Sequence, residues 1–211
     1  MNQIVEKVMN AKEILRLLDA ANDEDLMMSR MNCHIKGLHS IVLKNESGRL
    51  TRLFLCTPNH EMWKNIDIGL VLNLGVHNHR YDLTLSAVHG EAKNIVYLQA
   101  NPAYGVKTKV YRFHDKDNVV YLGNDWIREY SSIPITKVHM NRTELHTVYV
   151  NRYETASWLV EEGEEVKDST LLYTNKEVKC SQFKYFPSAK AVREYVKNYY
   201  KEHGDVLIYP N

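Results

Sequence analysis

Residues 75–82 read Gly-Val-His-Asn-His-Arg-Tyr-Asp and place His77 and His79 two positions apart, with one residue between them. On a strand, or where a strand begins, this spacing directs both side chains to the same face. Two imidazoles that converge from one face can start a metal site. The alternative interpretation is a pair of surface histidines beside a turn, because Asn78 and Arg80 alternate with them. Strands around this stretch and a further ligand would favour the metal site.

A strand pattern surrounds this stretch, from about residue 35 to residue 175. About eleven short segments rich in Val, Ile, Leu, Thr and Tyr fit strands. They are Leu38–Leu43, Leu50–Cys56, Asp67–Leu74, Tyr81–Val88, Ile95–Gln99, Val106–Phe113, Val119–Tyr121, Ile135–Met140, Leu145–Val150, Thr155–Val160 and Thr170–Tyr173. Turn signals such as Gly90 and Gly123-Asn124 separate them. Short strands with frequent turns indicate an all-β sandwich or barrel rather than a series of βαβ units.

Both ends of the chain read as helices. Apolar residues recur at three- and four-residue steps in residues 1–29, where Asn22 or Asp23 can cap a second short helix. Near the other end, Ser188 is a natural N-cap and Gly204 a natural C-cap. The sequence therefore predicts an N-terminal helical segment (1–34), a β domain (35–175) and a C-terminal extension with a helix (176–211).

Composition excludes several classes of protein. Lys plus Arg total 27 against 26 Asp plus Glu, and a formal charge of +1 argues against a nucleic-acid partner. The sequence shows neither a signal-peptide pattern nor an apolar run of membrane-spanning length, so we expect no membrane partner. Three widely spaced cysteines without a CxxC pair are typical of reduced thiols in a cytoplasmic protein. Ten His and fourteen Tyr against four Phe suit a polar interior pocket.

A third histidine, His146, lies in the strand-like segment Leu145–Val150. The arrangement resembles the cupin superfamily, whose first motif has two histidines separated by one residue, then a glutamate and a later glycine. His77, His79 and Gly90 match that motif, and His146 takes the place of the histidine in the second motif. The resemblance implies a double-stranded β-helix, or jelly roll. It also implies a divalent metal held by the three histidines.

The sequence departs from the cupin pattern at two places. Leu83 and Thr84 stand where the glutamate is expected, and Asn141 and Thr143 replace the proline and glycine of the second motif. Three histidines without the carboxylate resemble the cysteine dioxygenase branch of the cupins. This resemblance implies a non-haem Fe(II) dioxygenase that acts on a small polar molecule. Cupins often pair through sheet edges or terminal segments, so it also suggests a homodimer.

Other functions fit the same residues. Fe(II) is favoured because substrate and oxygen can bind at adjacent open positions. Zinc would suit an isomerase or a hydrolase with water as the fourth ligand. The missing glutamate and the incomplete second motif favour a third alternative, a cupin that binds a partner or ligand without turnover.

Two further residues could compete as ligands. His139 has Pro134 five residues before it, as the second cupin motif requires, but it lies an odd seven residues from His146. On one continuous strand that spacing places the two on opposite faces. Asp82 is oddly offset from His79, so we expect it to turn away and to form a salt bridge, for instance with Arg80.

Candidate substrate contacts are aromatic and basic residues of the expected strands, for which core packing is the alternative role. They are Tyr81, Arg112, Tyr149 and Trp158. Tyr81 shares its parity with His77 and His79. A cysteine dioxygenase would also need an arginine for the substrate carboxylate, and Arg52 and Arg112 are the candidates.

Overall fold

The computed structural model describes residues 9–33, 37–57, 75–114, 118–150, 154–166, 169–178 and 184–203. The strand predicted at Asp67–Leu74, the start of the first helix, and Gly204 lie outside these residues. The helices are α1 (Ala11–Ala20), α2 (Asp23–Met27) and α4 (Ala189–His203). The strands are β1 (Arg30–Met31), β2 (Leu38–Glu46), β3 (Arg49–Cys56), β4 (Val76–His77), β5 (Leu83–His89), β6 (Ala92–Gln99), β7 (Val106–Phe113), β8 (Val119–Pro134), β9 (Lys137–Met140), β10 (Leu145–Val150), β11 (Ala156–Glu162), β12 (Thr170–Thr174) and β13 (Lys184–Tyr185).

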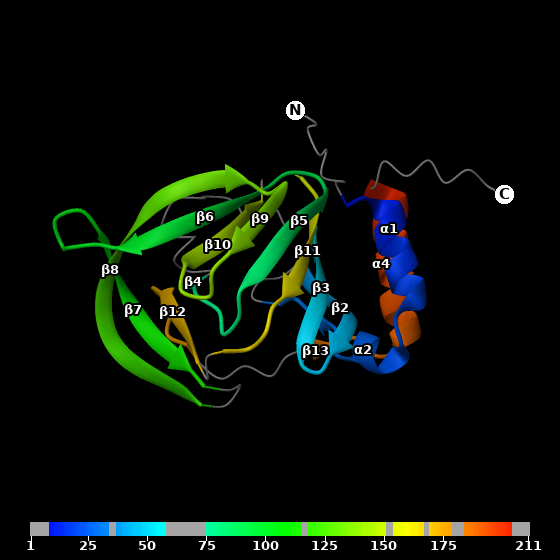
Figure 1. Cartoon of the computed structure of the whole chain (residues 1–211), viewed down its shortest axis with the longest axis horizontal. Coiled ribbons are helices and arrows are strands. Elements are labelled where there is room, and N and C mark those ends of the chain that lie inside the picture. Colours follow the sequence, from blue (N-terminus) through cyan, green and yellow to red (C-terminus); the bar gives the residue numbers. More distant parts are fainter. Residues whose placement is uncertain are drawn as a thin grey trace.

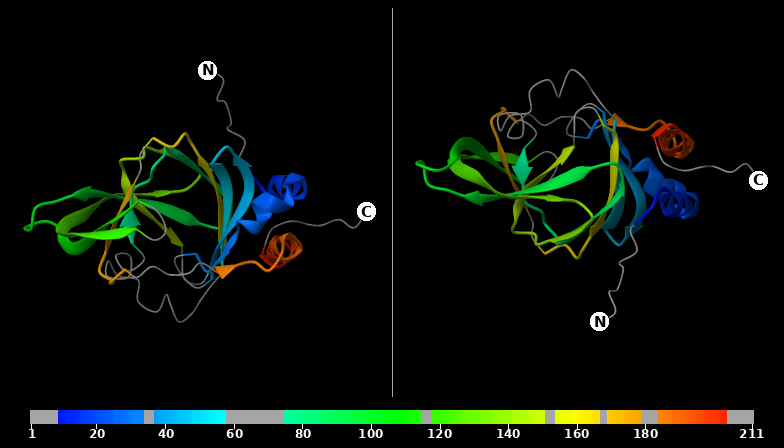
Figure 2. Two further views of the ribbon diagram at one scale, coloured as in Figure 1. Left: turned by 90° about the horizontal axis from the view of Figure 1, so that it is seen from below. Right: turned by 90° about the horizontal axis from the view of Figure 1, so that it is seen from above.

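The strands form two antiparallel units. One is a seven-stranded sheet in the order β13-β1-β2-β3-β11-β5-β9, and in the other β10-β4-β12-β7-β8-β6 close into a ring. The sheet lies between the ring and the helices α1 and α4, as Figures 1 and 2 show from three sides. The prediction of an all-β fold with terminal helices is confirmed, and the arrangement is consistent with a cupin jelly roll. The predicted flanking segments also add strands to the sheet, because β1 pairs with both β2 and β13.

Side chains of the seven-stranded sheet are buried on both faces. In β3, Leu53 and Leu55 pack toward the helices, whereas the alternating residues Phe54 and Cys56 pack toward the ring. This is the alternation that a pleated strand imposes. The helix-side core consists of Ala11, Ile14, Leu18, Ala21, Leu26, Ile41, Leu43, Leu53, Leu55, Leu159, Phe186, Ala189, Val192, Val196, Tyr199 and Tyr200. The inner core consists of Phe54, Cys56, Leu83, Leu85, Ala92, Ile135, Met140, Val150, Ala156, Trp158 and Val160.

A smaller ring core fills the inside of the six-stranded ring. It consists of Val76, Ile95, Tyr97, Val110, Ile127, Leu145 and Tyr173. Strand β10 contributes to two cores, because Leu145 packs into the ring core and Val150 into the inner core. By the same alternation, His146 shares a face with Val148 and Val150, which both pack with the inner core.

Helices α2 and α4 begin where the sequence predicts, after Asn22 and Ser188, whereas α1 begins at Ala11, later than the predicted helical segment. Asn10 and Glu13 form a capping box at the start of α1, and the side chain of Asn22 accepts a hydrogen bond from the backbone of Asp25 in α2. Ser188 Oγ accepts from the Ala191 backbone N–H at 3.1 Å and caps α4. These side chains satisfy N–H groups that the first turn of a helix leaves unpaired.

Strand β8 corrects a prediction. The sequence predicts that a strand ends at Tyr121 and that Gly123-Asn124 forms a turn, but β8 runs from Val119 to Pro134. Val110 of β7 pairs with Gly123 and the next residue pairs with Tyr121, so Leu122 is the extra residue of a β-bulge. Gly123 has a φ of +121°, which glycine adopts without steric cost. The glycine therefore marks a bulge in a strand that pairs with β7 and then with β6, closing the ring.

Candidate metal centre

His77, His79 and His146 come together at the junction of β4 and β10. Their potential ligand atoms all lie within 4.8 Å of one another. The ring centroid of His77 is 4.8 Å from that of His79 and 5.0 Å from that of His146. His146 pairs directly with His77 across the two strands, and the Nε2 atoms of His79 and His146 are 2.8 Å apart. The two sequence segments that carry the histidines thus meet on one face.

Asn78 fixes the segment between the first two histidines. Its side chain is buried, and its Oδ1 accepts a hydrogen bond from the Leu171 backbone N–H at 2.7 Å. Its own backbone N–H donates to the Leu171 carbonyl at 3.2 Å. Asn78 therefore attaches this segment to β12, while His79 N–H donates to the Arg142 carbonyl at 3.3 Å on the other side.

Asp82 forms a salt bridge and is not part of the histidine group. Its carboxylate accepts from the Arg142 backbone N–H at 2.7 Å and lies 3.5 Å from the Arg142 guanidinium. The partner is Arg142 rather than Arg80, whose guanidinium binds Glu165 and the His114 carbonyl. The Asp82–Arg142 bridge connects the segment after His79 to the loop before β10, and so it helps to bring the two histidine-bearing segments together.

Asn94 orients His146. The imidazole of His146 is 3% exposed, and its Nδ1 lies 2.7 Å from Oδ1 of the fully buried Asn94. With the amide oxygen accepting from Nδ1–H, the lone pair of Nε2 faces the other histidines. Burial, and secondarily His77, holds the pKa of His146 well below its usual value, so this imidazole is neutral, as a metal ligand must be. Sequence reasoning missed Asn94, although a polar residue inside the apolar strand Ala92–Gln99 was the available signal.

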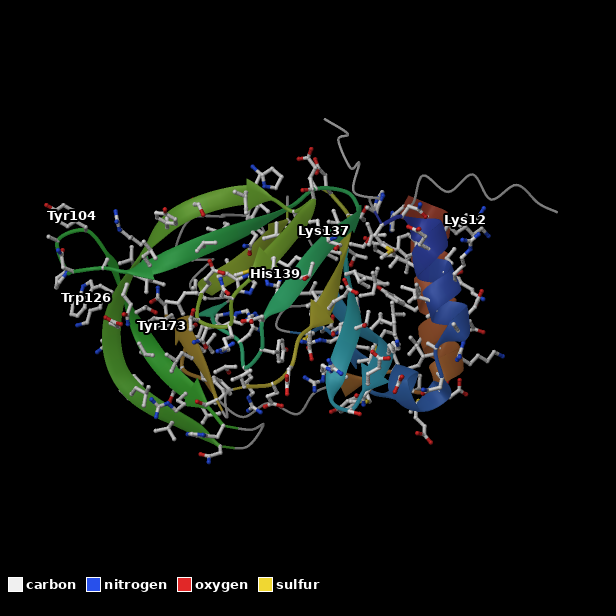
Figure 3. All side chains as sticks on the ribbon, viewed as in Figure 1. Lys12, Tyr104, Trp126, Lys137, His139 and Tyr173 are labelled. Atoms are coloured by element: carbon white, nitrogen blue, oxygen red, sulfur yellow. The ribbon has the colours of Figure 1, made fainter. Side chains whose placement is uncertain are left out.

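The other histidines of the described segments lie apart from this group. His139, labelled in Figure 3, is exposed on β9, and its Nδ1 is 3.2 Å from Thr84 Oγ1. His89 lies within 3.2 Å of Thr155 Oγ1. His34 and His60 lie outside the described residues.

Of the predicted substrate contacts, the structure brings Tyr81 to the histidines. Its ring centroid is 5.5 Å from that of His79. Trp158 is buried in the inner core and stacks on Phe54 with a centroid distance of 5.5 Å and an interplanar angle of 5°. Tyr149 packs with the ring core, on the face of β10 opposite to His146, and Arg112 is exposed on β7. A role for these four in substrate binding stays a prediction.

Arg52 and Glu162 form a largely buried ion pair next to Tyr81. The Tyr81 hydroxyl donates to Glu162 Oε1 at 2.7 Å and accepts from Arg52 Nη2 at 2.8 Å, while the guanidinium directly contacts the carboxylate. Burial opposes the charge of Arg52, but Tyr81 and Glu162 outweigh it and raise the pKa of the guanidinium. Arg52 is therefore a cation at every ordinary pH. Sequence reasoning singled out Arg52 but not its acidic partner, which lies 110 positions further along the chain.

The residues of the group fit a divalent metal. Metal–imidazole bonds of about 2.1 Å at right angles place two nitrogens about 3.0 Å apart. The His79–His146 separation of 2.8 Å is close to this value, and small rotations of the imidazoles can bring in the third nitrogen. Neutral imidazoles suit iron, zinc and related metals. The fold and the site together define an all-β protein, consistent with a cupin jelly roll, that carries a three-histidine group able to hold a metal ion.

Comparison with known proteins adds little to this description. No family model matches the sequence, and no curated protein matches it significantly. Among solved structures, one similar chain belongs to a hydroquinone 1,2-dioxygenase, PnpCD, crystallised with Cd²⁺ and 4-hydroxybenzonitrile. The two chains are 10% identical, 86% of this chain and 83% of that chain are covered, and the TM-score is 0.19. A match at this TM-score carries no argument about function. No helix of the described residues is long and apolar enough to cross a membrane.

Proposed function

We propose that this chain is a cupin-fold metalloprotein that holds a divalent metal on His77, His79 and His146. We further propose that the metal is Fe(II) and that the protein is a dioxygenase for a small polar molecule. The observation that supports the metal site is the convergence of three imidazoles, of which His77 and His146 lie opposite each other on paired strands and His79 follows β4. Asn94 adds a second support, because metal-binding histidines usually donate their other N–H to an acceptor.

The metal, the histidines, Tyr81 and the inner core would have different roles in such a site. Fe(II), when bound, would supply adjacent open positions for oxygen and substrate. His146 is buried whereas His77 and His79 are half-buried, so the open side of the group lies toward the latter two. Tyr81, whose ring lies beside His79, is the candidate contact for a molecule bound at the metal. The inner core beyond it excludes water, which strengthens every electrostatic contact made there.

The first test is metal content. Protein purified without chelator should contain about one metal ion per chain by elemental analysis, with iron predominating. The His77→Ala/His146→Ala double variant should lose it, because a single imidazole cannot retain the ion. His139→Ala, at an exposed histidine of β9, is the matched control and should keep it. Metal-free wild-type protein, or unchanged metal in the double variant, would disprove the site.

The second test separates the dioxygenase from the other metal-dependent functions. Fe(II)-loaded protein should consume oxygen with at least one member of a screen of thiols, small acids and their uncharged analogues, and the double variant should not. Zinc in the purified protein, without oxygen uptake, would instead favour an isomerase or hydrolase.

A further inference from the structure

The Arg52–Glu162 pair places opposite charges inside the protein beside the candidate metal centre. Arg52 and Glu162 come from the adjacent strands β3 and β11, whose register sets Arg52 opposite Val160. Both share parity with the inner-core residues Phe54 and Trp158, so their side chains extend toward the interior. The hydroxyl of Tyr81 contacts both, and the ring of Tyr81 lies against His79. The pair is thus one side chain away from the histidines.

The two charged side chains differ in their exposure. The side chain of Glu162 is 4% exposed, and its Oε2 also accepts from the Leu50 backbone N–H at 3.2 Å. The side chain of Arg52 is 18% exposed, so a molecule that approaches the pair meets the arginine first. The carboxylate lies behind it, held in place by three partners.

The charge of Arg52 is therefore already balanced. A buried arginine is a natural partner for a carboxylate, but here an internal carboxylate occupies it. At the Arg52 end of the site, away from the metal, a carboxylate ligand would bring a second negative charge to a single cation in a poorly screened interior, where like charges repel strongly. An uncharged molecule meets no such repulsion. It could also accept from Arg52 Nε, a buried donor that forms no hydrogen bond in the structure.

We infer that Glu162 is a specificity-determining residue that, by neutralising Arg52, makes the site select an uncharged, oxygen-bearing small molecule over a carboxylate. This inference rests on the proposed function, since the metal on the three histidines would hold the reacting part of that molecule. It names the class of substrate: hydroxyl, carbonyl or amide compounds without a negative charge at the Arg52 end.

The test compares a matched pair of ligands, propionate and propionamide, on the full chain. Glu162→Gln keeps the size of the side chain and an acceptor for the Leu50 N–H, but it releases the charge of Arg52. Titrations followed by NMR should show propionate affinity rising about tenfold or more in this variant, with propionamide affinity unchanged within about twofold. Glu165→Gln removes an exposed carboxylate that pairs with Arg80 and should change neither affinity. Unchanged propionate affinity in Glu162→Gln, or an equal gain for both ligands, would overturn the inference.

Two additional measurements keep this test separate from the proposed function. The titrations are run on metal-free and on Co(II)-loaded protein. Failure of the wild-type protein to bind Co(II) would disprove the metal site, but the selectivity between the two ligands could still be measured on the metal-free protein. If Glu162→Gln does not fold, the metal-free wild type decides the matter. Propionamide that binds at least as tightly as propionate supports the inference, and propionate that binds more tightly than propionamide overturns it.

Discussion

The two faces of the seven-stranded sheet bury polar groups in different ways. On the helix-side core, the buried polar atoms include tyrosine hydroxyls that bond to the backbone or to Ser157, as those of Tyr199 and Tyr200 do. On the inner side lie the Arg52–Glu162 ion pair and, across from it, the histidine group. A neutral hydroxyl with a partner costs little to bury, whereas buried charges and clustered imidazoles are expensive. We therefore expect the helix side to supply stability and the inner side to carry the chemistry.

The largest expected effect is loss of stability on the helix side. Leu18→Ala removes a fully buried side chain of α1 and should lower the free energy of unfolding by about 2–5 kcal/mol. Urea denaturation measures this change, and metal content should stay at the wild-type level in the folded variant. Leu17→Ala, at the exposed neighbour on the same helix, should change stability by less than about 0.5 kcal/mol. Metal loss from folded Leu18→Ala protein would show that the two sides are not separable.

The second effect is confined to the inner side. Asn94→Leu removes the acceptor for His146 Nδ1–H and should lower the affinity for Co(II) about 10–100-fold. Asn94→Asp keeps an acceptor oxygen and should recover most of that loss, whereas a merely structural role for the amide would not distinguish Leu from Asp in this way. Gln99→Leu, at an exposed residue of the same strand, is the control and should bind Co(II) normally. Wild-type affinity in Asn94→Leu would remove Asn94 from the site.

On the inner side, the sequence predicted the features that lie within one segment and missed the contacts between residues of different strands. The spacing of His77 and His79 and the strand pattern around His146 were sufficient to single out the three histidines that the structure groups together. The predicted strands Val106–Phe113 and Leu145–Val150 match β7 and β10 to the residue. Alternation of side chains is a local property, so it can be read from a short segment. The hydrogen bond between Asn94 and His146 and the ion pair between Arg52 and Glu162 depend on which strands become neighbours, and no short segment contains that information.

The excess of tyrosine over phenylalanine also shows what sequence alone does not predict. The composition predicted a polar interior pocket, and Tyr81 does lie beside His79. Three other tyrosines of α4, Tyr195, Tyr199 and Tyr200, instead pack with the helix-side core between α4 and the sheet. A count of residues cannot tell which side of a sheet they will cover.

A smaller effect tests the role of these helix-side hydroxyls. Tyr199 donates to the Ala156 carbonyl at 2.9 Å and is 3% exposed. Tyr199→Phe keeps the ring and should lower the free energy of unfolding by about 1 kcal/mol, the usual net contribution of one hydrogen bond. Tyr130→Phe, at a tyrosine that is 66% exposed on β8, is the control for losing a hydroxyl and should be neutral. Equal stability of wild type and Tyr199→Phe would mean that the hydroxyl is not needed to dock α4.

The smallest expected effect is a change in pH dependence at His39, the helix-side counterpart of His146. His39 is 7% exposed between Phe186 and Tyr195, with ring centroids 6.0 and 4.8 Å away. Burial lowers the pKa of His39 below its usual value near 6.5, so the folded protein binds fewer protons at this site than the unfolded chain does. Its contribution to stability is therefore complete above about pH 6.5 and is lost as the pH falls below that value.

Urea midpoints at pH 7.5 and pH 5.5 measure this contribution. The wild type should lose stability between the two, and His39→Phe, which keeps an aromatic ring against Phe186 and Tyr195, should lose less. The difference in slope cannot exceed about 1.4 kcal/mol per pH unit, the limit for one proton. His139→Phe, at an exposed histidine, should keep the wild-type slope. An unchanged slope in His39→Phe would assign the acid sensitivity to the inner histidines instead, and metal loading, which competes with their protonation, should then abolish it.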